Sequence, residues 1–288
     1  MKIGISSYSL FSALRSQEMS IIDVIQWVAD QGGEHIEIVP NLGFNFEENP
    51  KLVDEIREKA SEVGIDISNY AIGANFITET EEAFQAEIDR VKKEVDIANR
   101  LGVKFMRHDV ASRPIPETTI KNFEADLPQL VLACQEIADY ANEYGITTSV
   151  ENHGFYVQAS DRVQSLINHV DRPNFKTTLD VGNFLCVDED PVAAVKNNIS
   201  YASIVHFKDF LYRPAHLNPG EGWMQTASGN HIRGTIVGHG DLSMREIIKV
   251  VKESGYDGYI SIEFEGMEAC KQATKMGMDN VRRLWDEA

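Results

Sequence analysis

Cysteine is scarce in this sequence, with only three in 288 residues. They are Cys134, Cys186 and Cys270, which lie far apart along the chain and form no CxxC pair. This number and this spacing argue against a disulfide framework and against a structural zinc site built from thiolates. We therefore expect three reduced thiols.

Long hydrophobic runs are also missing. No stretch of the sequence approaches the roughly 18 apolar residues that a membrane-spanning helix requires. The N-terminal segment MKIGISSYSL lacks the apolar core and the small-residue cleavage site of a secretory signal peptide. We therefore expect a cytoplasmic protein without a membrane partner.

Basic residues are in deficit. The chain has 27 Lys and Arg against 45 Asp and Glu, which gives a formal net charge of -18. A field of that sign repels nucleic acid, so no DNA or RNA partner is expected. A glycine-rich phosphate loop is absent as well, because SSYSLFS follows the first strand-like run. Its absence argues against a doubly wound open sheet.

The sequence does contain a regular alternation of short β-branched runs with longer helical stretches. Eight strand candidates are each followed by a helix, and this order predicts a closed α/β barrel, the (β/α)8 TIM barrel. Such barrels run to ~250 residues as one domain, so we expect residues 1–288 to form a single domain. The strand candidates are centred near Ile5, Ile38, Ile67, Phe105, Ser149, Thr178, Ile204 and Ile262.

Local signals mark several helix ends. Ser20 and Asp23 form a capping-box pattern ahead of an apolar helical run. Three helical stretches end in a glycine that is followed by Ile or Val, because glycine suits the left-handed position that closes a helix. These three glycines are Gly64, Gly102 and Gly145.

One connection is much longer than the others. It runs from Leu211 to Leu242, between the seventh strand and the seventh helix, and is rich in Gly, Asn and Pro. Connections longer than ~15 residues are usually functional or disordered. We expect this insertion to lie at the C-terminal mouth of the barrel and to act as a lid, with Arg233 and His239 closing over the site.

Strand alternation places a polar side chain at the carboxyl end of each of the last four strands. In YISIEF the isoleucines and Phe264 share the face that meets the helices, which turns Glu263 into the barrel. The same alternation turns Glu151 inward in ITTSVE and Asp180 inward in FKTTLD. His206 ends the seventh strand, in ASIVHF.

These side chains together predict a metal site. Three carboxylates in a barrel mouth repel one another and resist desolvation unless a cation compensates their charge. An oxygen-rich set with one imidazole suits Mn2+, Mg2+ or Co2+ better than a thiolate zinc site does. We expect one divalent ion, Mn2+ ahead of Mg2+, Co2+ or Zn2+, with two positions left for adjacent substrate oxygens. The expected ligands are Glu151, Asp180, His206 and Glu263.

The segments SVENHG, TLDVGNF, VHFKD and GYDGYISIEFEG resemble those of the xylose isomerase-like TIM barrels. That superfamily holds ketose 3-epimerases, hydroxypyruvate isomerases, inosose dehydratases and the endonuclease IV enzymes. The resemblance follows the strand order of nearly the whole chain. It implies that the four predicted ligands match those of the sugar-active members, and that Glu151 and Glu263 are catalytic residues that move protons. It also implies a homodimer or homotetramer.

The function implied by this resemblance is that of a metal-dependent isomerase or epimerase of a ketose or related small-molecule sugar, in carbohydrate metabolism. A metal bound to a carbonyl and its neighbouring hydroxyl stabilises the developing enediolate, and carboxylates on either side remove and return the proton. A dehydratase or lyase on a keto-polyol, such as an inosose or a 3-keto-sugar, is the first alternative. A non-catalytic sugar-binding barrel is the second.

Five further side chains are candidates for binding the substrate. One lies two residues after the strand-five glutamate, two follow His206, and one lies in the long insertion. On the fourth strand, Val103 and Phe105 are expected to face outward, which turns the neighbouring histidine inward. The five candidates are His153, Lys208, Arg213, His108 and His239.

The chain also departs from members of the superfamily. Sugar epimerases often carry a histidine three residues after the strand-six aspartate, where this chain has Asn183. Endonuclease IV needs further histidines for its second and third zinc ions, and Asn69 and Asn183 stand where two would be expected. Together with the net charge of -18, these departures argue against a role in DNA repair.

Overall fold

Eight parallel strands close into a barrel in the computed structural model, which describes residues 1–288. Around the barrel the strands follow the order β1-β11-β7-β6-β5-β4-β3-β2, which confirms the predicted (β/α)8 fold. The barrel strands are β1 (Lys2–Ser6), β2 (His35–Ile38), β3 (Asp66–Ile72), β4 (Phe105–His108), β5 (Thr147–Glu151), β6 (Phe175–Asp180), β7 (Ala202–Phe207) and β11 (Tyr259–Ile262).

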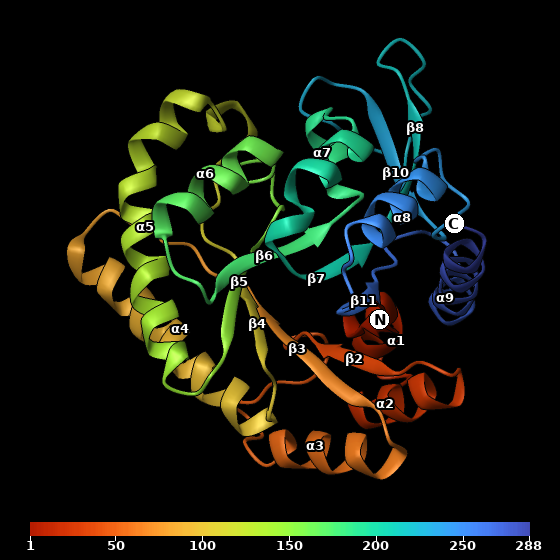
Figure 1. The fold of residues 1–288 in the computed structure, drawn as a ribbon, viewed down its shortest axis with the longest axis horizontal. Helices are drawn as coiled ribbons and strands as arrows, with labels where there is room; N and C mark the ends of the chain where they lie inside the picture. Colours follow the sequence, from red (N-terminus) through yellow and green to blue (C-terminus); the bar gives the residue numbers. More distant parts are fainter.

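Helices surround the strands (Figure 1). None of them combines the length and the apolar character needed to cross a bilayer. The helices are α1 (Phe11–Arg15), α2 (Ile21–Asp30), α3 (Leu52–Val63), α4 (Glu81–Leu101), α5 (Ile120–Asn142), α6 (Ser160–Val170), α7 (Pro191–Asn198), α8 (Met244–Glu253) and α9 (Cys270–Glu287).

The predicted helix-end signals are confirmed. Ser20 Oγ accepts the N–H of Asp23 at 3.1 Å, and the Asp23 carboxylate accepts the N–H of Ser20 at 2.9 Å, so a capping box opens α2. Gly64 and Gly102 end α3 and α4 with φ of 75° and 79°. Gly145, after α5, has φ of 66°. A side chain at any of these three positions would be strained.

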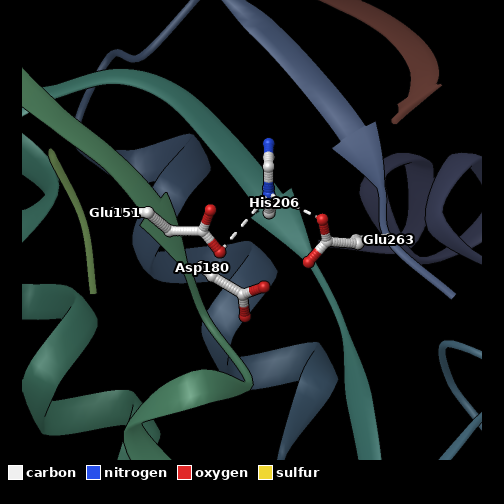
Figure 2. A group of neighbouring side chains, drawn as sticks. All are labelled: Glu151, Asp180, His206 and Glu263. Carbon is white, nitrogen blue, oxygen red and sulfur yellow. Dashed lines mark ion pairs between the residues drawn. The ribbon is translucent and has the colours of Figure 1, made fainter. Parts of the chain in front are cut away.

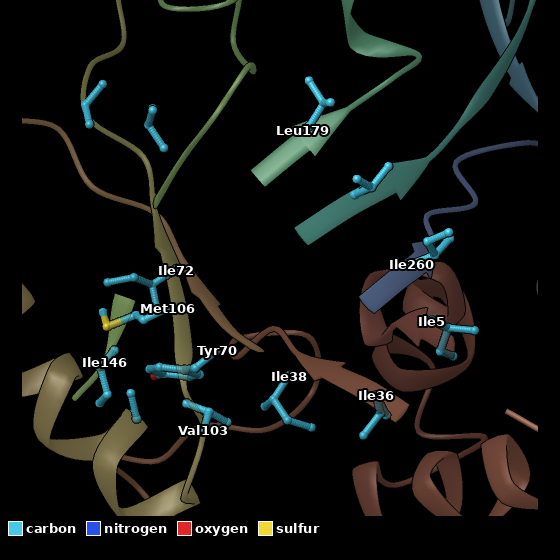
Figure 3. Close-up of a cluster of buried hydrophobic side chains, with 14 of the residues drawn as sticks. Ile5, Ile36, Ile38, Tyr70, Ile72, Val103, Met106, Ile146, Leu179 and Ile260 are labelled. Carbon is cyan, nitrogen blue, oxygen red and sulfur yellow. The ribbon is translucent and has the colours of Figure 1, made fainter. Parts of the chain in front are cut away.

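The hydrophobic core is a layer between the strands and the helices. A single cluster of 63 buried residues fills it. Figure 3 shows strand side chains that belong to this layer, among them Ile36, Met106 and Leu179. Because side chains alternate along a strand, the neighbours of these residues face the barrel interior. That interior is where the polar site is built.

The connection between β7 and α8 contains a small antiparallel sheet. Its strands are β8 (Asp209–Arg213), β9 (Met224–Gln225) and β10 (His231–Thr235), in the order β8-β10-β9. Gly234 of β10 pairs with Gly266, just beyond β11. The backbones are so close there that a Cβ on Gly234 would lie 2.0 Å from the Glu265 carbonyl oxygen. The sheet is therefore packed against the carboxyl end of the barrel, and its role as a lid stays a prediction.

Asp209 anchors the turn that leads from this sheet to α8. Its carboxylate accepts backbone N–H groups from Phe210 (2.9 Å), Gly238 (2.9 Å) and Gly240 (3.0 Å). Burial raises the pKa of Asp209 to about 6, although these N–H groups act in the opposite direction. The first residue of β8 thus holds the end of the insertion.

Replacing Asp209 with alanine is expected to lower the free energy of unfolding by about 2–4 kcal/mol, because four backbone donors, Leu242 at 3.4 Å among them, lose their acceptor. Asp209→Asn keeps one carbonyl oxygen and is expected to lose less. Urea denaturation of the metal-free variants measures both effects. An Asp209→Ala protein as stable as the wild type would show that the turn does not depend on this carboxylate.

Candidate metal centre

The four predicted ligands converge at the carboxyl end of the barrel. One ligand atom from each lies within 4.8 Å of the others, and all four side chains are buried. Figure 2 shows the four groups directed toward a common centre. Two of them end β5 and β6, one lies in β7, and one directly follows β11; in that order they are Glu151, Asp180, His206 and Glu263.

Each ligand presents one defined atom to this centre. His206 Nδ1 lies 3.7 Å from Glu263 Oε1 and 4.0 Å from Glu151 Oε1. Asp180 presents Oδ2, because its Oδ1 accepts the backbone N–H groups of residues 182 and 183 at 2.8 and 3.0 Å. The turn after β6 therefore fixes the orientation of the Asp180 carboxylate.

The donor set fits a divalent cation. Asp180 Oδ2 and His206 Nδ1 are buried and have no hydrogen-bond partner. Buried polar atoms of this kind cost free energy unless something binds them. Carboxylate oxygens with one imidazole nitrogen are ligands that Mn2+, Mg2+ and Zn2+ accept. The centre can therefore hold one divalent ion between these four side chains.

Glu37 of β2 orients the histidine and was not predicted from the sequence. Its Oε2 atom lies 3.0 Å from His206 Nε2 and accepts a hydrogen bond from Asn69 Nδ2 at 2.7 Å. A carboxylate on one ring nitrogen fixes the tautomer, which leaves the other nitrogen free for a metal. Alternation in HIEI could have identified this residue, because Ile36 and Ile38 both face the core.

Replacing Glu37 with glutamine is expected to weaken Mn2+ binding by about 10–100-fold, because His206 loses the anionic acceptor that orients it. Asn69→Ala removes only the donor behind Glu37 and is expected to have a smaller effect. Calorimetric titration of the metal-free chain with Mn2+ gives both affinities. Glu34→Gln, just before β2, is the control. An unchanged affinity in Glu37→Gln would mean that the imidazole is held by other contacts.

Two cations occupy the second oxygen of each glutamate. Arg107 Nη2 lies 2.6 Å from Glu151 Oε2, and Lys208 Nζ lies 2.7 Å from Glu263 Oε2. Each glutamate therefore has one oxygen near His206 and the other on a cation. This arrangement favours one coordinating oxygen per glutamate, because a bidentate contact would require breaking the ion pair.

Opposite charges at short range set the pKa values of the metal-free centre. Burial lowers the pKa of His206, but Glu37 and Glu263 outweigh it and raise that pKa well above its ordinary value. Burial raises the pKa of Glu263, but Lys208 and His206 outweigh it and hold that pKa well below its ordinary value. For Asp180 burial prevails and raises the pKa to about 7.

The predicted inward orientation of His108 is wrong. Its ring packs against Phe76 and Phe175 at centroid distances of 5.9 and 6.1 Å, and its Nδ1 donates to the Asp109 carbonyl at 2.9 Å. Burial lowers the pKa of His108 to about 4, so it is a neutral residue of the core layer. Its neighbour Arg107 faces the barrel interior instead, and contacts Glu151 there.

The other candidate contacts lie at different distances from the centre. Lys208 is part of it, and His153 lies on an exposed rim, with Nδ1 3.8 Å from Asp109 Oδ1. Arg213 pairs with Asp241 at 3.2 Å, and the structure gives it no ion pair with the ligands. The remaining two, in the inserted sheet and the turn after it, also have no hydrogen bond to the ligands; they are Arg233 and His239.

Asn183 connects the two sides of the centre. Its Nδ2 donates to Glu151 Oε1 at 3.1 Å, and its Oδ1 accepts from Lys208 Nζ at 3.3 Å. A histidine at this place has no oxygen acceptor for the ammonium group. Asn183, which stands where epimerases often carry a histidine, therefore makes two contacts here, to Glu151 and to Lys208.

The fold and the site together define a class of protein. It consists of closed (β/α)8 barrels in which three carboxylates and a histidine at the carboxyl end can hold a cation. Within that class the chain belongs to the xylose isomerase-like TIM barrel family, whose profile matches residues 25–284. This match covers most of the chain and confirms the resemblance found in the sequence.

A curated relative is the inosose dehydratase of Lacticaseibacillus casei, 25% identical over 138 residues. The match covers 48% of this chain and 46% of the relative, so it spans about half the length of each. At this identity and coverage it relates the two chains without assigning a reaction to this one.

Solved structures share the fold over almost the whole chain. The probable 3-DHS dehydratase AsbF from Bacillus anthracis superposes with a TM-score of 0.76 at 18% identity, covering 98% of this chain and 99% of that one. The IOLI protein, described with a binding zinc atom, gives 0.77 at 18%, covering 100% and 99%. D-psicose 3-epimerase from Clostridium cellulolyticum H10 gives 0.75 at 17%, covering 99% of each. Both dehydratases and epimerases therefore occur among the similar proteins.

Proposed function

We propose that this chain is a divalent-metal-dependent enzyme that moves a proton next to the carbonyl group of a ketose or related keto-polyol, as an isomerase or epimerase. The observation that carries this proposal is the geometry of the two glutamates. Glu151 and Glu263 approach His206 Nδ1 from β5 and from the end of β11, at 4.0 and 3.7 Å. Both are buried beside Asp180 Oδ2 and His206 Nδ1, which have no hydrogen-bond partner.

A divalent ion bound here would polarise a substrate carbonyl and its neighbouring hydroxyl, which acidifies the C–H between them. We propose Mn2+, because the set is mostly carboxylate oxygen with one imidazole. The chain's own residues then move the proton. A carboxylate oxygen of Glu151 or Glu263 accepts it from one side of the substrate, and the other glutamate, in its protonated form, donates its own proton from the opposite side.

The destination of the proton decides the reaction class. Return to the opposite face of the same carbon gives an epimer, and return to the neighbouring carbon gives an isomer. Either outcome brings solvent deuterium into the product, because the glutamate that donates the proton exchanges it with solvent between turnovers. The same abstraction followed by loss of a hydroxide gives dehydration, and the similarity to an inosose dehydratase supports this second candidate.

The test is to incubate the Mn2+-loaded chain in D2O with a panel of ketoses and keto-polyols that includes inososes and 3-keto-sugars. Deuterium incorporation at a carbon next to the carbonyl, followed by NMR, reports proton abstraction whatever the final product. An absorbing enone, or net loss of water in the mass spectrum, would favour the dehydratase. Absence of exchange with every compound, combined with tight binding of one of them, would favour a sugar-binding barrel without turnover.

A further inference from the structure

A cavity of 230 Å3 lies beside the metal centre, at the carboxyl end of the barrel. It is formed between the segment that follows β1 and the segment that leads from β11 to α9, and we call it the β1–β11 cavity. None of the four metal ligands lines it. A cavity of about 150 Å3 already admits a six-membered ring. The β1–β11 cavity therefore has room for a ring beyond the group that is held at the metal.

Two aromatic rings form one wall of this cavity. The ring centroids of Tyr8 and Phe11 lie 5.6 Å apart, and the rings are inclined to each other by 33°. Both residues are only half-buried, so part of their surface is open to the cavity. Aromatic surface of this kind gains free energy when an apolar face packs on it. The C–H groups on one side of a pyranose ring form such a face.

Polar groups line the rest of the cavity. Glu265 Oε1 accepts the Tyr8 hydroxyl at 3.0 Å, and Ser12 adds an exposed hydroxyl. Glu268 Oε1 accepts from Thr235 Oγ1 at 2.7 Å, while its Oε2 is buried and has no hydrogen-bond partner. Carboxylates and hydroxyls accept hydrogen bonds from the O–H groups of a sugar. Aromatic walls with a few polar groups are the usual composition of a small-molecule site.

Glu265 connects the β1–β11 cavity to the metal centre. One of its oxygens bonds Tyr8 in the cavity wall, and the other lies 3.3 Å from Lys208 Nζ. That ammonium group lies 2.7 Å from Glu263 Oε2. One carboxylate and one ammonium group therefore separate the cavity from a metal ligand. The Glu265 side chain is 37% exposed, so a molecule that is long enough can pass over it.

The opposite side of the barrel mouth offers less space. A cavity of 130 Å3 lies there, between the segments that follow β3, β4 and β5. Small side chains such as Ala74, Ala111 and Val157 line it together with Glu151 and His153, and no Phe, Tyr or Trp contributes. A bulky ring attached to the reacting group is therefore expected on the side of β1 and β11.

We infer that the β1–β11 cavity is a second sugar-binding subsite and that the substrate is a glycoside, which rests on the proposed function. The ketose or keto-sugar that reacts at the metal carries a further pyranose ring. This second ring packs on Tyr8 and Phe11, and its hydroxyls bond Glu265 and Ser12. The linkage between the two rings is not broken in the reaction.

The test compares a ketose with its glucosides on the full-length Mn2+-loaded chain. Calorimetry is carried out with D-fructose and with turanose, maltulose and isomaltulose, which carry a glucosyl group on O3, O4 and O6 of fructose. At least one disaccharide is expected to bind more tightly than fructose by about 10–100-fold, the gain from one or two hydrogen bonds to a charged group. The three linkages direct the second ring differently, so the best of them reports where the subsite lies.

Two variants locate this preference in the cavity. Ser12→Trp fills the cavity from the exposed side of α1, and it is expected to lower the affinity ratio of the best disaccharide to fructose to about 1. Phe11→Leu keeps an apolar side chain but removes the ring, and it is expected to lower the same ratio by about 2–10-fold. Ser16→Trp is the matched control, because Ser16 is exposed on the same segment outside the cavity. It is expected to keep the ratio of the wild type, and circular dichroism checks all three folds.

Equal or weaker binding of all three disaccharides than of fructose, or no binding of any of them, would overturn the second subsite. A disaccharide preference that persists in both Ser12→Trp and Phe11→Leu would overturn it too. Failure of the proposed function looks different. In that case no compound, disaccharides included, exchanges deuterium, while the preference for a disaccharide and its loss in Ser12→Trp are still observed.

Discussion

Turnover is expected to fall by about 10^2–10^4-fold when Glu263 is replaced with glutamine, the range that positioned general acid–base groups contribute. The amide has the size of the carboxylate and can still accept from Lys208, so the fold is expected to survive. It cannot take up the substrate proton, and it is a weaker metal ligand. Deuterium exchange on the best substrate of the panel measures the loss, and circular dichroism checks the fold.

The control for this variant is Glu253→Gln, the same change on the exposed face of α8, where Glu253 lies 4.0 Å from Lys249. It is expected to exchange deuterium at the wild-type rate. Full activity of Glu263→Gln at saturating Mn2+ would refute the assignment of this carboxylate to proton transfer. If Glu263→Gln loses both its activity and its folded spectrum, the assignment is tested with Glu263→Asp instead, because aspartate keeps the charge.

Removal of the metal is the second large effect. A chain stripped with a chelator is expected to show no exchange above background, and its melting temperature is expected to fall by roughly 5–15 °C. The physical reason is that an ion present at 100–1,000 times its dissociation constant stabilises the folded state by about 3–4 kcal/mol. It also relieves the repulsion among the three clustered carboxylates. Differential scanning calorimetry with and without Mn2+ measures the shift.

The matched variant for this experiment is His206→Ala, which removes one ligand atom from the cluster. Its melting temperature is expected not to respond to Mn2+ at concentrations that saturate the wild type. Re-addition of Mn2+ to the stripped wild type should restore both the exchange and the melting temperature. A stripped wild type that melts at the same temperature and still exchanges would exclude a metal-dependent reaction in this barrel.

Much of the fold was predictable from local patterns. Strand-like runs, helical periodicity and closing glycines each depend on a few neighbouring residues, and their repetition eight times leaves few alternatives to a closed barrel. The ligand side of β5, β6 and β11 followed from alternation, because apolar and polar residues separate cleanly there. On β7, His206 was predicted as a ligand because it lies near the carboxyl end of the strand.

Alternation failed on β4 for a physical reason. Its first two residues, Phe105 and Met106, are both apolar, so hydrophobicity does not tell which faces the helices. The structure directs Met106 to the core layer and Phe105 into the barrel, where its ring lies 6.3 Å from the centroid of Tyr259 on β11. Arg107 pairs in register with Ser149 on β5 and so reaches Glu151, while His108 is left in the core.

Contacts between distant parts of the sequence could not be predicted. Glu37 and His206 are 169 residues apart, and no local pattern connects them. The insertion was predicted to act as a lid, and this stays a prediction, but no pattern in the sequence indicated that β8 and β10 pair into a sheet there. Such pairing depends on the register of two separate segments, which composition does not encode.

The hydrogen bond from His206 to Glu37 makes the centre depend on both halves of the chain. Cutting the polypeptide between β4 and β5 would leave all four ligands on the C-terminal fragment. That fragment would nevertheless lack the acceptor that holds the imidazole, and the guanidinium that engages Glu151. Reassociation with the N-terminal fragment would therefore be needed to restore the geometry. Although its ligands come from consecutive strands, the site is not an autonomous half-barrel unit.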